Sequence, residues 1–112
     1  MNKKDKGWGY EIIFANNNLY CGKLLVFNSN KKFSMHYHVK KDETWYVSKG
    51  KFLCRIIDTK IGITNEFELN AGDSLHIPPG TPHQLIALED SIIFEVSTEH
   101  FDDDSYRIHK GD

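Results

Sequence analysis

Residues 36–43 read HYHVKKDE, and this stretch decides how the fold is assigned. His36 and His38 are two residues apart in a strand-like segment, so their side chains leave the same face of the strand and can converge on one point. Glu43 stands at an odd spacing from both histidines, which would place it on the opposite face of a continuous strand. Residues 39–42 are predicted to form a turn that resets this parity, so that a hairpin returns Glu43 to the cavity of the two histidines.

A further candidate ligand follows a proline-rich loop. Residues 78–82 read PPGTP, and the prolines fix backbone angles that can aim His83 at low entropic cost. Three neutral imidazoles and one carboxylate suit a divalent transition metal such as zinc, iron, manganese, nickel or copper, whereas magnesium and calcium favour more oxygen ligands. We therefore predict a metal site made of His36, His38, Glu43 and His83, with coordination positions left open for chemistry. The other three histidines, His76, His100 and His109, are not predicted ligands.

Short segments rich in β-branched and aromatic residues recur between turn signals along the chain. They cover residues 10–14, 19–27, 33–38, 44–48, 51–58, 63–69, 74–77, 84–88 and 91–96. No helix of about ten residues or more is predicted. Many short strands at this spacing predict an all-β fold, either an antiparallel sandwich or a barrel that hides its strand edges. With 112 residues the chain has room for one such domain, so residues 1–112 are predicted to form a single domain.

Charge, hydropathy and cysteine content exclude several kinds of partner. The net charge is -2 and the lysines are scattered among acids, so no nucleic-acid surface is predicted. No apolar run approaches the roughly 20 residues of a membrane span, and residues 1–9 lack the apolar stretch of a secretory signal. Cys21 and Cys54 lie in apolar, strand-like segments and are predicted to be buried free thiols of a cytoplasmic protein. The acidic residues 102–104 are predicted to be solvated surface.

The histidine spacings resemble the two sequence motifs of the cupin superfamily. The positions that match the first motif are His36, His38, Glu43 and Gly50, and those that match the second are Gly72, Pro78, Gly80 and His83. Asn30 stands where the first motif opens with glycine, and asparagine can adopt the left-handed conformation that glycine supplies there. Ala87 stands where the second motif ends with asparagine, and neither departure touches a ligand. The resemblance implies the cupin double-stranded β-helix, a jelly-roll barrel, with the metal in its interior.

A narrower resemblance covers nearly the whole chain. Residues 7–11 (GWGYE), 20–26 (YCGKLLV), 43–50 (ETWYVSKG), 94–97 (FEVS) and 102–107 (DDDSYR) look like the cupin domain of type II mannose-6-phosphate isomerases. The resemblance implies a metal-dependent aldose-ketose isomerase of sugar-phosphate or nucleotide-sugar metabolism, with a sugar or sugar phosphate as substrate. It also implies a homodimer, for which residues 8–14 are the candidate edge strand.

An isomerase of this kind needs a base that removes a proton beside the sugar carbonyl. The sequence offers Glu95, His76, Tyr46 and Lys49, and we select Glu95 first, with Tyr46 and His76 as further catalytic candidates. Arg55 and Arg107 are candidates to hold a phosphate. The aromatic residues Trp45, Tyr37 and Phe94 are expected either in the core or along the cavity.

Two other functions fit the same ligand set. Three histidines and a glutamate with open positions would equally serve an iron-dependent dioxygenase. A barrel of this kind can also bind a metal or a small ligand without turnover, because a fold does not determine a function.

Overall fold

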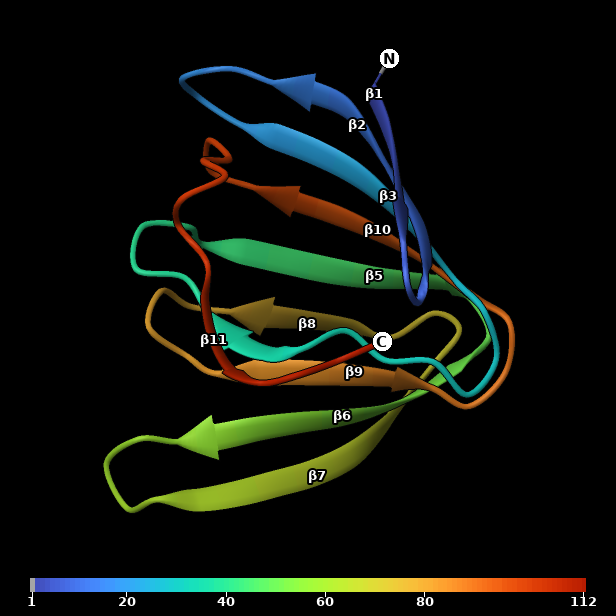
Figure 1. The fold of residues 1–112 in the computed structure, drawn as a ribbon, viewed down its shortest axis with the longest axis vertical. Coiled ribbons are helices and arrows are strands. Elements are labelled where there is room, and N and C mark those ends of the chain that lie inside the picture. The colour runs from blue at the N-terminus through green and yellow to red at the C-terminus, as the bar shows by residue number, and fades with distance from the viewer. Residues whose placement is uncertain (1) are drawn as a thin grey trace.

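The structure, a computed structural model, describes residues 2–112 and contains two antiparallel β-sheets. The first sheet has six strands in the order β1 (Asn2–Lys6), β2 (Gly9–Asn16), β3 (Cys21–Phe27), β10 (Ser91–Ser97), β5 (Glu43–Lys49) and β8 (Ser74–Ile77). The second has five, in the order β11 (Tyr106–His109), β4 (Met35–Tyr37), β9 (His83–Ala87), β6 (Lys51–Asp58) and β7 (Ile63–Asn70). The two sheets face each other (Figure 1), which confirms the predicted all-β jelly roll.

Residues 2–112 contain no helix long and apolar enough to cross a membrane. The strand alternation is visible along β5, where Glu43, Trp45 and Val47 are buried and the residues between them are more exposed. Inward side chains of both sheets form one core. Its aromatic part lies around Phe27, which stacks on Trp8 at 4.4 Å and meets Phe52 edge-on at 5.0 Å between ring centroids.

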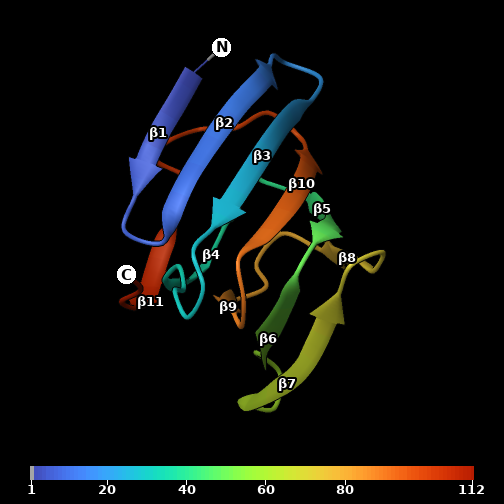
Figure 2. The ribbon, with the colours of Figure 1, turned by 90° about the vertical axis from the view of Figure 1, so that its right-hand side faces the viewer.

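Sequence patterning predicted nine of the strands and missed β1 and β11. Both missed strands lie at sheet edges, and almost all of their residues are exposed, so they lack the apolar alternation that marks a half-buried strand. β1 extends the first sheet beside β2 (Figure 2). The edge proposed for dimer formation, residues 8–14, is therefore not free, because β2 pairs with β1 on one side and with β3 on the other.

Two local predictions are confirmed. Asn30 has φ of 67°, the left-handed conformation expected where the motif calls for glycine. Cys21 and Cys54 are free and buried, and burial raises the pKa of both thiols, that of Cys54 to about 12.

The route of the chain to Glu43 differs from the predicted hairpin. β4 carries His36 and belongs to the second sheet, whereas β5 begins at Glu43 in the first sheet, and the two strands are not paired. Residues 39–42 therefore cross from one sheet to the other, and Glu43 reaches the cavity from the opposite wall. Because the chain changes sheets between His38 and Glu43, Glu43 can point into the cavity despite its odd spacing from the histidines.

Candidate metal centre

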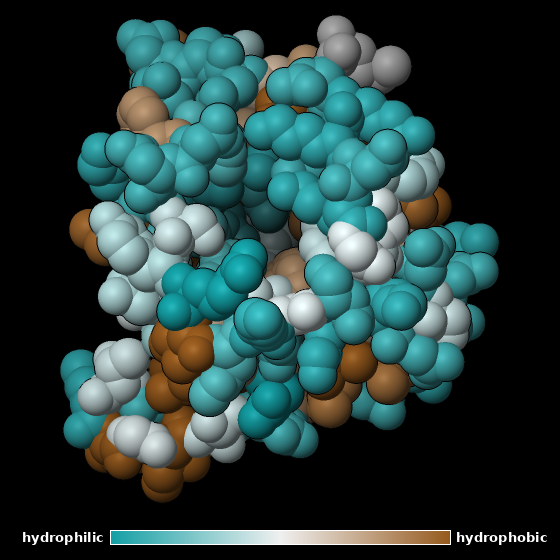
Figure 3. Space-filling view, in the orientation of Figure 1, coloured by the Kyte–Doolittle hydropathy of each residue, from teal (hydrophilic) through white to brown (hydrophobic). Residues whose placement is uncertain are grey.

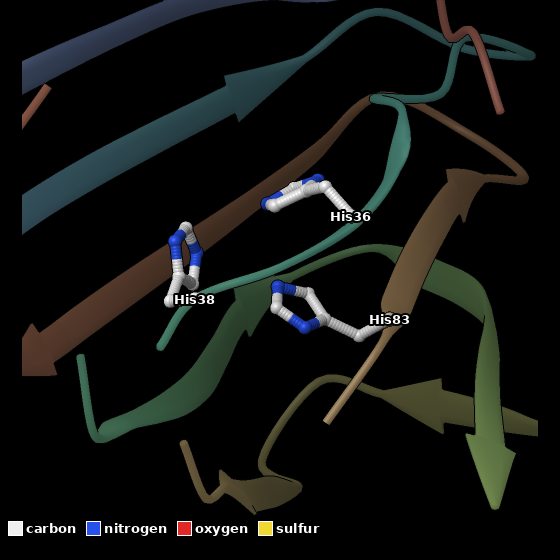
Figure 4. A group of neighbouring side chains, drawn as sticks. All are labelled: His36, His38 and His83. Carbon is white, nitrogen blue, oxygen red and sulfur yellow. The ribbon is translucent and has the colours of Figure 1, made fainter. Parts of the chain in front are cut away.

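Three histidines converge inside the barrel. His36 on β4 pairs in register with His83 at the start of β9, and His38 follows β4 directly. One ring nitrogen from each of the three lies within 4.8 Å of the others, and the rings face a shared space (Figure 4). These are three of the four predicted ligands.

Backbone carbonyls fix the protonation of each ring. The Nδ1 atoms of His36, His38 and His83 lie 2.7, 2.6 and 2.8 Å from the carbonyl oxygens of Ser34, Asp104 and Thr81. A carbonyl oxygen only accepts, so each Nδ1 carries the proton and donates it, and each Nε2 keeps a free lone pair. Held rings with a free nitrogen are the usual state of metal-binding histidines.

The surroundings keep the rings neutral. Burial lowers the pKa of His36 and of His83 to about 3 and also lowers that of His38. Neutral imidazole is the form that binds a metal ion, so these histidines need release no proton when an ion enters.

Glu43 lies beside two of the histidines. Its Oε2 lies 3.4 Å from Nε2 of His38, and its Oε1 lies 3.8 Å from Nε2 of His83. Oε2 is buried and has no hydrogen-bond partner among residues 2–112. Burial, followed by the negative charge of Glu95, raises the pKa of Glu43 well above its ordinary value. The three imidazole lone pairs fit a divalent transition metal, which His36, His38 and His83 would hold, and Glu43 is placed beside two of them to add an oxygen ligand.

Asp104 supports this centre from the C-terminal segment. Its carboxylate accepts hydrogen bonds from the backbone N–H groups of Val39, Lys40 and Lys41, and its carbonyl oxygen accepts one from Nδ1–H of His38. Asp104 is buried, so the prediction that residues 102–104 are solvated surface is wrong for this residue. Sequence gave no signal for it, because its partners lie more than 60 positions earlier in the chain.

The histidines and Glu43 open onto a cavity of about 360 Å³. Figure 3 shows a hollow bordered by hydrophilic side chains on the face where the N-terminal hairpin and the C-terminal segment lie. The charged side chains that line the cavity include Glu11, Lys23, Lys41, Glu95 and Arg107. All of these except Arg107 are buried.

Glu95 lies in this cavity, as selected from sequence. It is 5% exposed, and its Oε1 accepts a hydrogen bond from the Trp45 indole at 3.2 Å. Its Oε2 has no hydrogen-bond partner among residues 2–112 and lies 3.7 Å from the Lys41 ammonium. Burial alone would raise the pKa of Glu95, but the charges of Lys41 and Lys23 outweigh it and lower the pKa. Glu95 is therefore an ionised carboxylate beside the metal centre.

The other two catalytic candidates lie outside the cavity. Tyr46 is on the outer face of β5, and His76 is exposed on β8 with its Nε2 bonded to Asp42. Neither lines the cavity, nor does the further candidate Lys49. Strand parity accounts for this, because Tyr46 and Glu95 sit one residue apart in the register of β5 and β10.

The remaining candidates divide in the same way. Arg107 lines the cavity, whereas Arg55 is bonded to Glu66 and Gln84 on the outside of the second sheet. Trp45 is fully buried core and touches the site through Glu95. Tyr37 stacks on Tyr106, and Phe94 is on the outer face. Sequence reasoning missed Lys23 and Glu11, whose signal was a charged residue inside an apolar, strand-like segment. It also missed Lys41, which lies in the predicted turn and had no such signal.

Two facing antiparallel sheets with a histidine cluster between them define a class of small metal-binding barrels. Residues 23–97 match the family model described as the cupin domain, which is more than half of the chain. The chain belongs to the cupin family.

Two curated proteins resemble the chain in sequence. An uncharacterised protein of Bacillus subtilis, YdbB, is 32% identical over 81 residues, which are 72% of this chain and 64% of that protein. An uncharacterised protein of Methanocaldococcus jannaschii is 33% identical over 54 residues, 48% of this chain and 38% of that protein. This chain therefore spans less than two thirds of the length of either relative.

Solved structures share the fold at low sequence identity. KdgF from Halomonas sp. superposes with a TM-score of 0.78 at 23% identity, covering 92% of this chain and 90% of that one. An oxalate decarboxylase variant from Bacillus subtilis gives 0.85 at 19% identity, covering 96% and 30%. The capsular polysaccharide assembling protein CapF from Staphylococcus aureus gives 0.85 at 18%, covering 96% and 31%.

Proposed function

We propose that this cupin is a metal-dependent enzyme that interconverts the aldose and ketose forms of a sugar phosphate or related sugar. The observation that carries the proposal is Glu95, an ionised and buried carboxylate that lines the same cavity as the three-histidine cluster. Buried ionised groups concentrate at functional sites. Proton transfer at carbon requires a carboxylate, or another base, beside an electrophilic centre.

The proposed chemistry divides between the ion and the side chains. A divalent ion held by the histidines and Glu43 would polarise the sugar carbonyl and orient the neighbouring hydroxyl. Glu95 removes the proton from the carbon that bears the hydroxyl and returns it to the former carbonyl carbon, while the hydroxyl proton passes to the former carbonyl oxygen. Trp45 holds Oε1 of Glu95, which leaves Oε2 as the oxygen that receives the proton.

Arg107 supports an anionic substrate, because it lines the cavity and makes no ion pair among residues 2–112. Lys23 and Lys41 line the cavity too, but each lies beside a carboxylate, that of Glu11 and that of Glu95. Of the proteins that share the fold, one assembles capsular polysaccharide and another is an oxalate decarboxylase, so carbohydrate and carboxylate chemistry both occur on this scaffold. The buried free thiols support a reducing, cytoplasmic setting.

Solvent proton exchange tests the proposal. Protein loaded in turn with zinc, manganese, iron, nickel or copper is incubated in deuterated water with a panel of aldose and ketose phosphates. We expect deuterium at the carbon beside the carbonyl, and formation of the isomer, for at least one metal and sugar. Glu95→Gln should lower the rate by roughly 100-fold or more, the contribution typical of a general base.

The matched control is Tyr46→Phe, one register position away on the outer face, which should leave the rate unchanged. An unchanged rate in Glu95→Gln would remove the proposed base. Substrate-dependent oxygen uptake by the iron form, without exchange, would identify a dioxygenase instead. No exchange with any metal and any sugar would leave a binding protein without turnover.

A further inference from the structure

Lys41 and Glu95 form a buried ion pair without a hydrogen bond between the two charged groups. Lys41 is 3% exposed, and its Nζ lies 3.7 Å from Oε2 of Glu95, longer than a hydrogen bond. The Glu95 oxygen has no hydrogen-bond partner among residues 2–112. Buried charged groups normally have hydrogen-bond partners. The unpaired Glu95 oxygen beside the Lys41 ammonium therefore points to a ligand atom that contacts both groups.

Lys41 also lines the same cavity as the three histidines and Glu43. Its ammonium can therefore contact a molecule that is bound at the histidines.

The backbone of Lys41 is fixed by the residue that also fixes a histidine. Asp104 accepts the Lys41 N–H at 3.0 Å, and the Asp104 carbonyl holds Nδ1 of His38 at 2.6 Å. The backbone of Lys41 and the imidazole of His38 are thereby held by one residue, as in a preorganised site.

We propose that Lys41 binds an anionic oxygen of the substrate, attached to the carbon next to the one from which Glu95 takes a proton. This assignment rests on the proposed function and specifies its substrate class, an α-hydroxy carbonyl compound that acquires negative charge on oxygen. When the C–H bond breaks, its electron pair forms the carbon–carbon double bond, and the carbonyl pair moves onto oxygen. The proton passes to Glu95, and the Lys41 ammonium donates a hydrogen bond to the new oxyanion.

A pair of ligands tests this without any turnover. Zinc-loaded protein is titrated calorimetrically with glycolate, which carries an anionic oxygen beside a hydroxyl, and with glycolamide, its neutral analogue. We expect glycolate to bind more tightly to the wild type, and Lys41→Met to weaken glycolate by at least about tenfold while leaving glycolamide unchanged, the size of one charge-assisted hydrogen bond. Lys41→Arg, which keeps the charge, should recover part of the loss.

The matched control is Lys40→Met, which removes the same charge from the exposed neighbouring position. Zinc affinity is measured for each variant, because an unfolded variant would lose it. If Lys41→Met does not fold, the glycolate affinity of Lys41→Arg is compared with that of the wild type instead. Equal glycolate affinity in wild type, Lys40→Met and Lys41→Met would overturn the assignment, as would a wild type that prefers glycolamide. Failure of sugar isomerisation with a positive binding result would overturn the proposed function and leave Lys41 as an anion site.

Discussion

Two rows of side chains on the six-stranded sheet lie one residue apart and differ in every respect. The inner row runs through Lys23, Glu95 and Trp45, and the outer row through Leu24, Phe94 and Tyr46. The buried row carries the charges, and the exposed row is apolar. This is the reverse of what folding alone favours, because a buried charge costs free energy and an exposed apolar patch gains nothing. The buried charges lie where we propose that the substrate binds.

The largest effect is expected from breaking an ion pair on the inner face. Lys23 and Glu11 are both buried, with Nζ and Oε2 3.1 Å apart. Glu11→Leu leaves the Lys23 ammonium buried without this partner and should lower the free energy of unfolding by about 3–5 kcal/mol. Urea denaturation measures it.

The double variant Glu11→Leu/Lys23→Met is the control for this prediction. It removes both charges, and most of the lost stability should return. If the single and double variants were equally destabilised, packing rather than charge would explain the loss, and the inner row would lose its special character.

A smaller effect is expected from pH in the metal-free protein. The pKa of His36 and of His83 is lowered to about 3, below the usual 6.5, so the unfolded chain binds more protons between these values. Stability is therefore complete above pH 6.5 and is lost as the pH falls towards 3. The raised pKa of Glu43 acts in the opposite direction above pH 4.5 and offsets part of the loss.

The net change can be measured by denaturation at pH 7 and pH 5.5. We expect a decrease of roughly 1–2 kcal/mol at the lower pH, because several neutral histidines outweigh one carboxyl group. Greater stability at pH 5.5 would mean that the rings are not held neutral.

The smallest effect concerns the support of the centre. Asp104→Ala removes the carboxylate that caps the N–H groups of residues 39–41, at a cost of about 1 kcal/mol in unfolding free energy. Because the turn positions His38, zinc affinity should also fall, by about tenfold. Asp103→Ala, at the exposed neighbouring position, should change neither quantity. Equal zinc affinity in both variants would show that Asp104 supports the fold alone.

Sequence predicted the parts of this centre that depend on local spacing. The two-residue separation of His36 and His38 and the proline loop before His83 are short-range features, and parity turns them into convergent ligands. The predicted hairpin before Glu43 was wrong, because residues 39–42 cross between the sheets. Either route lets Glu43 point into the cavity, so the spacing alone could not tell them apart. Asp104 and Lys41 could not be assigned, since their roles depend on segments more than 60 residues apart meeting in space.

The same limit explains the choice among the proposed bases. Glu95, Tyr46 and His76 are equivalent as titratable residues in strands, and only the register of β10, β5 and β8 separates the inward residue from the two outward ones. Strand bounds from a pattern are uncertain by a residue or more, and one residue reverses the direction of a side chain.

Zinc binding to three proteins, the wild type, His83→Ala and His76→Ala, tests the metal centre most directly. We expect one ion per chain and a raised melting temperature for the wild type and for His76→Ala, whose histidine is on the outer face. His83→Ala should lose at least about 100-fold in affinity, together with the rise in melting temperature. Equal zinc affinity and equal stabilisation of all three proteins would contradict it.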